Sequence, residues 1–181
     1  LLVKTGALYH DIGKTLHPSY FVENQSSRNP HEGKTPLEST EIIIEHVTEG
    51  VQMAKKHRLP NVLIDFIRTH HGTTRVEYFY RNYKNEHPDE EVDEAFFRYP
   101  GPKPRSKEET ILMMADSIEA ACKSLKNPTE ALIDETIEKI IAGKITQAQL
   151  QDSRLTFKEL EMCKREFKKI IKSIYHARLE Y

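Results

Sequence analysis

The sequence predicts an all-α protein. Apolar residues recur at helical spacing over most of its 181 residues, and no stretch alternates β-branched with polar residues as a strand would. Prolines and glycines separate the helical stretches. Three of those stretches begin with a hydroxyl residue followed three positions later by glutamate, the pattern of a capping box. Together these observations predict a bundle of six or seven helices.

The first helix is expected to end at His10 and Asp11 and to be largely buried, because apolar residues precede this pair: Leu1, Leu2, Val3, Ala7 and Leu8. Its last turn carries His10 and Asp11 side by side. Gly13 is placed to end this helix, since glycine accepts the left-handed conformation common just past a C-terminus.

A polar loop, residues 15–35, follows, with Tyr20 and Phe21 as its expected anchors. The next helix starts at a capping box formed by Thr35 and Glu38 and runs to His46. Gly50 is expected to interrupt it, and a second amphipathic stretch continues to residue 58.

Pro60 begins a further helix, which ends at His70 and His71 with Gly72 as the stop signal. Residues 73–105 are irregular in composition, apart from a short helix expected near residues 76–80. The prolines of residues 99–104 exclude a regular element there, because they remove backbone donors.

The C-terminal part is expected to form three helices. Ser106 and Glu109 start the first, which carries Asp116 among apolar residues. Pro128 begins the second, and Gly143 is expected to stop it. The last starts at residues 156–159, and its inward face is expected to hold Leu160, Cys163, Phe167, Ile170 and Ile174.

Composition limits the classes of function. The 27 basic and 28 acidic residues give a net charge of −1, which excludes a protein that coats nucleic acid or a membrane surface. No apolar run is long enough to span a bilayer, and no signal peptide is recognisable. The chain lacks an initiator methionine, so we expect a fragment of a longer protein. Cys122 and Cys163 lack zinc-site spacing and are expected to be small core residues in a reducing compartment.

Four polar sites stand out on otherwise apolar helices. They are His10 with Asp11, His46, His70 with His71, and Asp116. Taken alone, each is more often a hydrogen-bonded core residue, and His71 could face solvent. Together they favour a metal centre, because buried charge is costly unless it is paired or bound to metal. Imidazoles with shared carboxylates suit iron, manganese or zinc, and two such ions can activate water and clamp a phosphoryl group.

The order of these residues resembles the HD hydrolase superfamily, which comprises all-helical metal-dependent phosphohydrolases. More specific motifs resemble the cytosolic HD domain of bacterial seven-transmembrane HD receptors, a family that includes cyclic di-AMP phosphodiesterases. The resemblance covers residues 1 to about 125. Its motifs are Tyr20-Phe21-Val22-Glu23-Asn24-Gln25, Asn29-Pro30-His31, Glu45-His46-Val47, His70-His71-Gly72-Thr73, Tyr99-Pro100-Gly101-Pro102-Lys103-Pro104 and Met114-Ala115-Asp116-Ser117-Ile118-Glu119-Ala120.

The resemblance implies an HD-domain-like helical bundle over residues 1–181, with the metal site at its centre. It implies the cytoplasmic domain of a bacterial inner-membrane protein, joined to the membrane only through upstream segments. Two divalent transition metal ions, iron or manganese, are expected. His10, Asp11, His46, His70 and Asp116 are the implied ligands, with Asp11 bridging the two ions and His71 an extra ligand or phosphate contact.

The implied activity is hydrolysis of a cyclic dinucleotide, cyclic di-AMP by resemblance, to a linear dinucleotide. Lys14 could neutralise phosphate charge, and Arg75, Lys103 and Arg105 are looser candidates that rest only on their loop positions. Phe21 and the tyrosines of residues 15–35 and 99–104 could stack on bases. No nucleic-acid polymer is expected as a partner, and homo-oligomerisation stays open. Two alternatives also stay open: a nucleotidase or dinucleoside-polyphosphate hydrolase, and a non-catalytic metal-binding signalling module.

Two departures from the superfamily pattern lead to further expectations. The superfamily's first histidine lies on a helix upstream of the HD pair, and this chain begins nine residues before His10. We therefore expect the site of His10 and Asp116 to bind metal more weakly than that of His46 and His70, and turnover to be slow without an upstream extension. The acidic residue and GYP motif of the cyclic di-GMP-cleaving branch are also absent after His71.

Overall fold

The computed structural model describes residues 1–25 and 29–179, which divide into two compact units, residues 1–102 and 103–181. The prediction of an all-α protein is confirmed. Within the described residues the structure contains helices and a single isolated β-bridge, between Arg75 and Arg98, with no β-strand.

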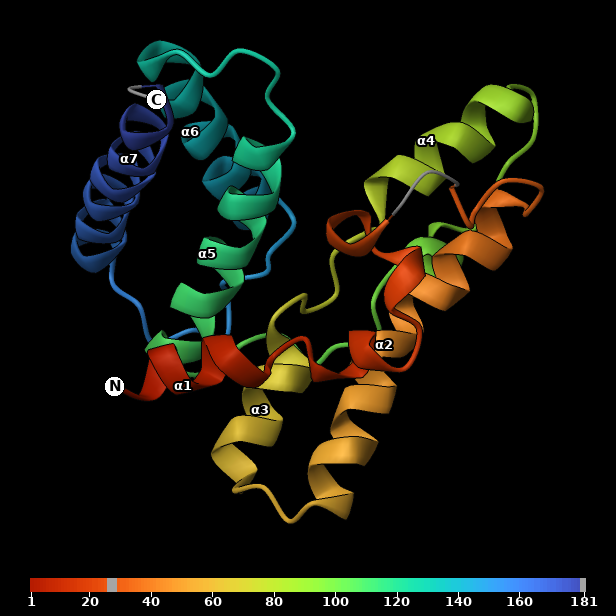
Figure 1. The fold of residues 1–181 in the computed structure, drawn as a ribbon, viewed down its shortest axis with the longest axis horizontal. Coiled ribbons are helices and arrows are strands. Elements are labelled where there is room, and N and C mark those ends of the chain that lie inside the picture. Colours follow the sequence, from red (N-terminus) through yellow and green to blue (C-terminus); the bar gives the residue numbers. More distant parts are fainter. Residues whose placement is uncertain (26–28, 180–181) are drawn as a thin grey trace. The chain divides into compact units, whose positions relative to one another are not determined.

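Among its described residues, the first unit holds four α-helices and four short 3₁₀ helices. Figure 1 labels the α-helices. The α-helices are α1 (Leu2–Tyr9), α2 (Pro36–Lys56), α3 (Asn61–Thr69) and α4 (Glu77–Glu86). The 3₁₀ helices are η1 (Ile12–Thr15), η2 (Pro18–Tyr20), η3 (Val22–Asn24) and η4 (Glu94–Phe97). Helix α2 is the centre of this unit, because η1, α3, α4 and η4 all pack against it.

Helix α2 begins as predicted and does not break at Gly50. Thr35 and Glu38 form the reciprocal hydrogen bonds of a capping box. The expected interruption is wrong, because Gly50 lies inside one continuous helix. Its missing side chain serves a close approach instead: a Cβ on Gly50 would lie 3.2 Å from the backbone nitrogen of Gly13.

Gly13, on η1, likewise allows the close approach between η1 and α2. It does not adopt the left-handed conformation expected of it and lies within η1. A Cβ on Gly13 would lie 1.9 Å from the carbonyl oxygen of His46, so only glycine fits. The two glycines thus bring the backbone after Asp11 directly onto α2. Gly72, by contrast, ends its helix with a positive φ of 54°, as predicted.

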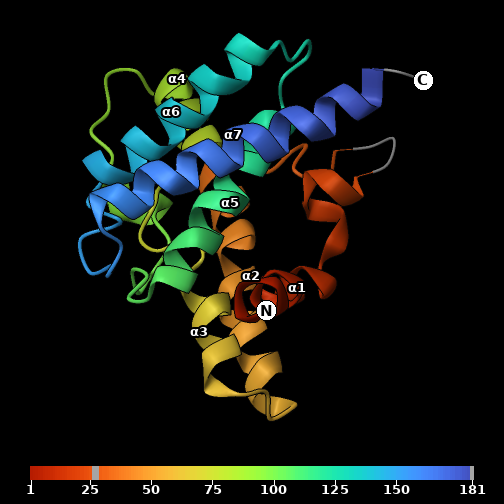
Figure 2. The same cartoon turned by 90° about the vertical axis from the view of Figure 1, so that its left-hand side faces the viewer.

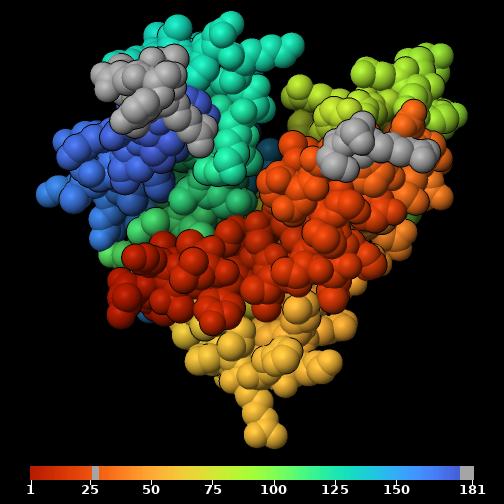
Figure 3. Space-filling model, viewed as in Figure 1, coloured from red at the N-terminus to blue at the C-terminus, as the bar shows by residue number. Residues whose placement is uncertain are grey.

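Helix α1 is more exposed than its apolar sequence suggests. Gly6 is its only buried residue, and Leu8 is 75% exposed. A Cβ on Gly6 would lie 2.7 Å from the ring of Phe66, so a narrow strip of α1 packs on α3 and the rest faces outward. Figure 3 shows this first segment, in red, at the surface of the molecule. The expectation of a largely buried first helix is therefore wrong.

The second unit is a three-helix bundle of α5 (Lys107–Lys123), α6 (Glu130–Thr146) and α7 (Phe157–Leu179), which pack on one another (Figure 2). Thr156 and Glu159 cap α7 as predicted. Gly143 lies inside α6 and does not stop it. On α7, Ile170 and Ile174 face outward, and Ile171 enters the core instead.

None of the helices among the described residues is both long and apolar enough to cross a membrane. The four histidines and Asp11 that the sequence singled out lie in the first unit, where η1 meets α2 and α3.

Candidate metal centre

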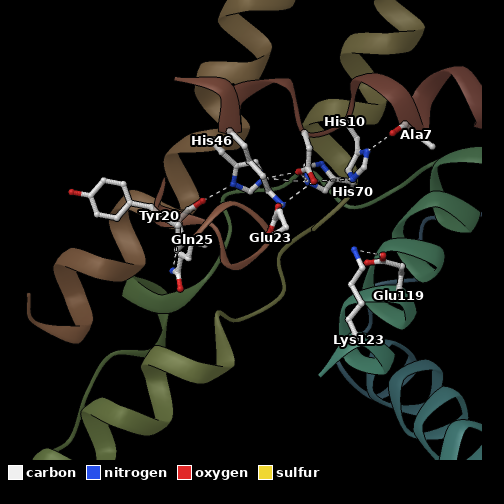
Figure 4. Close-up of polar contacts among 12 residues, drawn as sticks. Ala7, His10, Tyr20, Glu23, Gln25, His46, His70, Glu119 and Lys123 are labelled. Carbon is white, nitrogen blue, oxygen red and sulfur yellow. Dashed lines mark hydrogen bonds and ion pairs between the residues drawn. The ribbon is translucent and has the colours of Figure 1, made fainter. Parts of the chain in front are cut away.

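Four side chains of the first unit converge on one point. His10 and Asp11 follow α1, His46 lies on α2, and His70 ends α3. Figure 4 shows the imidazoles of His10, His46 and His70 directed toward one another. The Nε2 atoms of His46 and His70 are 3.3 Å apart, and each lies 3.5 Å from Oδ1 of Asp11.

The three histidines share one orientation, which fixes their tautomers. In each ring Nδ1 lies within hydrogen-bond distance of the carbonyl oxygen three residues earlier, at 2.9 Å for His10, 2.5 Å for His46 and 2.7 Å for His70. A carbonyl oxygen can only accept, so Nδ1 carries the proton. The neutral ring then presents Nε2 as a bare acceptor, which is the arrangement typical of metal-bound histidine.

This geometry fits a metal ion. Without a cation, Nε2 of His46 and Nε2 of His70 would face each other as two lone pairs, beside a buried Asp11 oxygen that accepts no hydrogen bond. A point equally distant from those three atoms lies about 2 Å from each, the length of a metal–nitrogen or metal–oxygen bond. His10, Asp11 and His70 form a second group whose ligand atoms lie within 4.8 Å of one another.

The protonation states also suit metal binding. Burial lowers the pKa of His46 to about 4, and the neighbouring His70 adds to this effect. Burial alone would raise the pKa of Asp11, but the adjacent imidazoles of His10 and His70 outweigh burial and hold that pKa below its ordinary value. At neutral pH His46 is therefore uncharged and Asp11 ionised, the forms that bind metal.

His71 lies at the edge of the same group. Its ring centre is 4.0 Å from that of His70, and its ligand atom lies within 4.8 Å of those of His46 and His70. The ring of Tyr99 stacks on it, with centres 4.2 Å apart and planes 24° apart. His71 is thus placed to act either as a ligand or as a contact to a bound anion.

Lys14 also reaches the centre. Its Nζ lies 2.8 Å from Oδ2 of Asp11 and 2.8 Å from Oε1 of Glu23. Burial alone would lower the pKa of Lys14, but these two carboxylates outweigh it and raise the pKa above its ordinary value. The two oxygens of Asp11 therefore have different neighbours. Oδ1 faces the imidazoles of His46 and His70, and Oδ2 faces His10 and Lys14.

The guanidinium group of Arg75 already has partners within the fold. It lies 2.8 Å from an oxygen of Glu77 and 2.7 Å from one of Glu94, and it covers the ring of Tyr80 at 3.7 Å. These contacts hold the backbone beside Arg98, to which Arg75 is bridged. A contact between Arg75 and substrate stays a prediction.

The remaining predicted residues lie in the second unit. Asp116 is half-buried on α5. Burial of Lys144 lowers the pKa of that lysine to about 8, and the nearby charge of Asp116 partly opposes this effect. Lys103 and Arg105 precede α5, and Arg105 is exposed. Their roles as ligand and substrate contacts stay predictions.

Sequence reasoning missed two kinds of contact. Glu23 was recognised only as part of a motif, although its carboxylate binds Lys14. Phe21 and Tyr99 were expected to meet bases, but both are buried, with Phe21 edge-on to His46 and Tyr99 stacked on His71. Figure 4 shows the Tyr20 ring directed away from His10, His46 and His70, and this ring lies edge-on to His31 instead. No periodicity or short spacing could have indicated these tertiary partners.

Comparison with known proteins agrees with this geometry. The HD domain pattern matches residues 1–121, and the chain belongs to the HD domain family. Its relatives include the cyclic-di-AMP phosphodiesterases PgpH of Bacillus subtilis (strain 168) and Listeria monocytogenes serotype 1/2a (strain 10403S). Each is 43% identical over 182 residues, covering all of this chain and 25% of the relative. The chain thus spans about a quarter of the length of these curated relatives.

Solved structures are similar as well. The HD domain of the L. monocytogenes phosphodiesterase PgpH, crystallised in complex with cyclic-di-AMP, superimposes with a TM-score of 0.92 at 42% identity. The match covers 96% of this chain and 81% of that one. A second structure of the same domain gives a TM-score of 0.90 at 41% identity, covering 97% and 82% of the two chains. The HD-like helical fold with a His/Asp cluster is therefore established for this chain.

Proposed function

We propose that this chain is a metal-dependent phosphodiesterase that hydrolyses cyclic di-AMP to a linear dinucleotide. The observation that carries the proposal is the convergence of Asp11, His46 and His70, whose ligand atoms lie 3.3 to 3.5 Å apart. The crystallised L. monocytogenes HD domain, which holds cyclic-di-AMP, supports the choice of substrate.

The same arrangement supports binding of two divalent ions, for which we propose iron or manganese. His46 and His70 would hold one ion with Asp11, and His10 and Asp116 would hold the other, with Asp11 shared. When bound, such ions supply Lewis acidity that activates water and neutralises phosphoryl charge. Residues 1–181 would act as one HD domain.

The protein groups position the substrate and balance its charge. Hydrolysis adds water across the bond between phosphorus and the 3′ oxygen: the water oxygen joins phosphorus, and a proton reaches the leaving oxygen. Lys14 offers a cation beside Asp11 for a phosphate oxygen. His71, at the edge of the cluster, can donate to the same phosphate or to the leaving oxygen.

The length of the PgpH relatives supports a setting in a larger protein. This chain matches a quarter of each, and we propose that it is the cytoplasmic domain of a bacterial inner-membrane protein. Fractionating cells that express the full-length gene tests this: the HD domain should stay with the membrane and be open to protease from the cytoplasmic side.

A substrate panel tests the activity. The manganese-loaded protein is incubated with cyclic di-AMP, cyclic di-GMP, a dinucleoside polyphosphate and mononucleotides, and products are separated by chromatography. Cyclic di-AMP should yield the linear dinucleotide fastest. Turnover of mononucleotides or the polyphosphate alone would indicate a nucleotidase or polyphosphate hydrolase. No turnover by fully loaded protein, with or without an upstream extension, would indicate a signalling module.

A further inference from the structure

Lys14 is fixed more firmly than an ordinary surface lysine. Its Nζ lies between Oδ2 of Asp11 and Oε1 of Glu23, at 2.8 Å from each. The ammonium group of Lys14 also lies over the ring of Phe21, whose centre is 5.0 Å from Nζ. Phe21 is buried and contacts the ring of His46, so this platform belongs to the metal centre itself.

After its contacts with the two carboxylates, the ammonium group of Lys14 has one N–H donor left. A lysine ammonium has three N–H donors, and two of them meet the carboxylates of Asp11 and Glu23. Within residues 1–25 and 29–179, no further acceptor contacts Nζ. The ring of Phe21 offers no oxygen or nitrogen acceptor, so the remaining donor can meet an anionic oxygen of a phosphate.

Glu23 does not touch the histidine cluster. Its side chain is 46% exposed, and its contact in this region is to Lys14, nine residues away. An exposed ion pair contributes little to stability. Its effect here is to restrict a flexible four-carbon side chain to one position, which reduces the entropy that phosphate binding must otherwise cost.

We propose that Glu23 is a positioning residue for phosphate binding, because it holds Lys14 against Asp11 with one donor free for a phosphate oxygen. The inference rests on the proposed function in that the ligand is a phosphate group. It extends that function by assigning a role to η3, which lies outside the metal ligands.

Bulk charge and positioning predict opposite results when Glu23 is replaced. Removing a negative charge near an anion site should tighten phosphate binding if only the local potential matters. Loss of the contact that positions Lys14 should instead weaken phosphate binding. The sign of the change therefore separates the two effects.

The experiment measures the affinity of inorganic phosphate by calorimetry, using the full chain loaded with Mn²⁺ and freed of excess metal. Glu23→Ala should weaken binding about fivefold, and Glu23→Gln by less, because the amide oxygen still accepts a hydrogen bond from lysine. Metal content should not change. Glu41→Gln, which removes a charge from an exposed carboxylate on α2, is the matched control and should not weaken binding.

A double-mutant cycle shows whether Glu23 acts through Lys14. In a Lys14→Met background, Glu23→Ala should change phosphate affinity by less than about twofold. An equal effect in both backgrounds, unchanged or tighter binding in Glu23→Ala, or no phosphate binding by the unmodified protein would each overturn the proposal. Phosphate binding that follows the cycle, in a protein that stays inert toward cyclic di-AMP with and without an upstream extension, would refute the proposed function and leave this inference standing.

Discussion

At the scale of single residues, Asp11 connects the parts of the metal centre. Its Oδ1 faces the Nε2 atoms of His46 and His70, and its Oδ2 faces His10 and Lys14. Neither His10 nor His46 could replace it, because an imidazole has only one nitrogen free once Nδ1 is bonded to a carbonyl oxygen. Among the described side chains of this cluster, we therefore propose Asp11 as the group that would bridge two ions.

Asp11→Asn should therefore remove both metals while leaving the helices intact. An amide keeps the shape of the carboxylate but loses its charge, and we expect the affinity for Mn²⁺ to fall by more than about tenfold. Metal analysis after gel filtration measures the loss, and circular dichroism checks the fold. Retention of two ions per chain by this variant would contradict the assignment.

At the scale of secondary-structure elements, the position of the HD pair depends on how closely η1 approaches α2. Gly13 and Gly50 allow backbone to contact backbone, and no side chain separates the two elements. His46 contributes its carbonyl oxygen to this contact and its imidazole to the metal site. Packing and ligand geometry are thus coupled through one turn of α2.

Gly13→Ala should destabilise the protein severely, because the new Cβ would lie 1.9 Å from the carbonyl oxygen of His46. We expect a loss of more than about 3 kcal/mol in the free energy of unfolding, or failure to fold. Gly143→Ala is the control: nothing lies within 4 Å of its Cβ inside α6, and it should add about 0.5–1 kcal/mol. Chemical denaturation measures both, and a stable Gly13→Ala variant would refute the close approach.

A second element-scale prediction concerns the start of α7. Hydrogen bonds from Lys107 and Thr156 lower the pKa of Glu159 to about 2. Because this pKa is below the ordinary value of 4.5, the interaction stabilises the fold above pH 4.5 and is lost as pH falls toward 2. The ion pair between Glu159 and Lys107 joins the first turn of α7 to the start of α5.

Glu159→Gln should therefore lower the Tm at pH 7, and the difference from the unmodified protein should shrink steadily below pH 4.5. Thermal scans in the presence of a chelator measure this from pH 7 to pH 3. Glu166→Gln, a change at an exposed position on the same helix, should leave Tm nearly unchanged at every pH. A Tm difference for Glu159→Gln that does not depend on pH would contradict the assigned cause.

Local signals in the sequence were sufficient for some elements. The capping residues Thr35 and Thr156 mark helix starts correctly, because capping involves only neighbours along the chain. The predictions that Gly50 interrupts a helix and that Gly143 stops one were wrong. A glycine inside a helical stretch looks the same in sequence whether it breaks the helix or lies within it. The pairing of Lys14 with Glu23 and of His71 with Tyr99 depends on tertiary packing and carries no periodic signal.

At the scale of the whole molecule, the chain consists of two units, and the proposed ligands come from both. The first unit supplies His10, Asp11, His46 and His70. The second would supply Asp116, which lies on a helix whose buried face forms that unit's own core. The proposal that Asp116 is a ligand predicts that activity requires a residue of the second unit as well as those of the first.

Asp116→Asn should lower the metal content of the manganese-loaded protein further at the site of His10, which is already expected to bind its ion more weakly than the site of His46 and His70. The ion that His46 and His70 would hold keeps its proposed ligands, whereas the ion that His10 would hold loses a carboxylate. Hydrolysis of cyclic di-AMP should fall at least about a hundredfold, since the mechanism needs both ions. Unchanged metal content in Asp116→Asn would remove Asp116 from the site and would leave the first-unit cluster as the only candidate.

Anomalous diffraction from crystals of the manganese-loaded protein tests the central claim most directly. We predict a strong anomalous peak about 2 Å from each of Oδ1 of Asp11, Nε2 of His46 and Nε2 of His70, at the point on which these atoms converge. A metal-loaded crystal with no peak there, or with its ordered manganese bound elsewhere, would contradict the account.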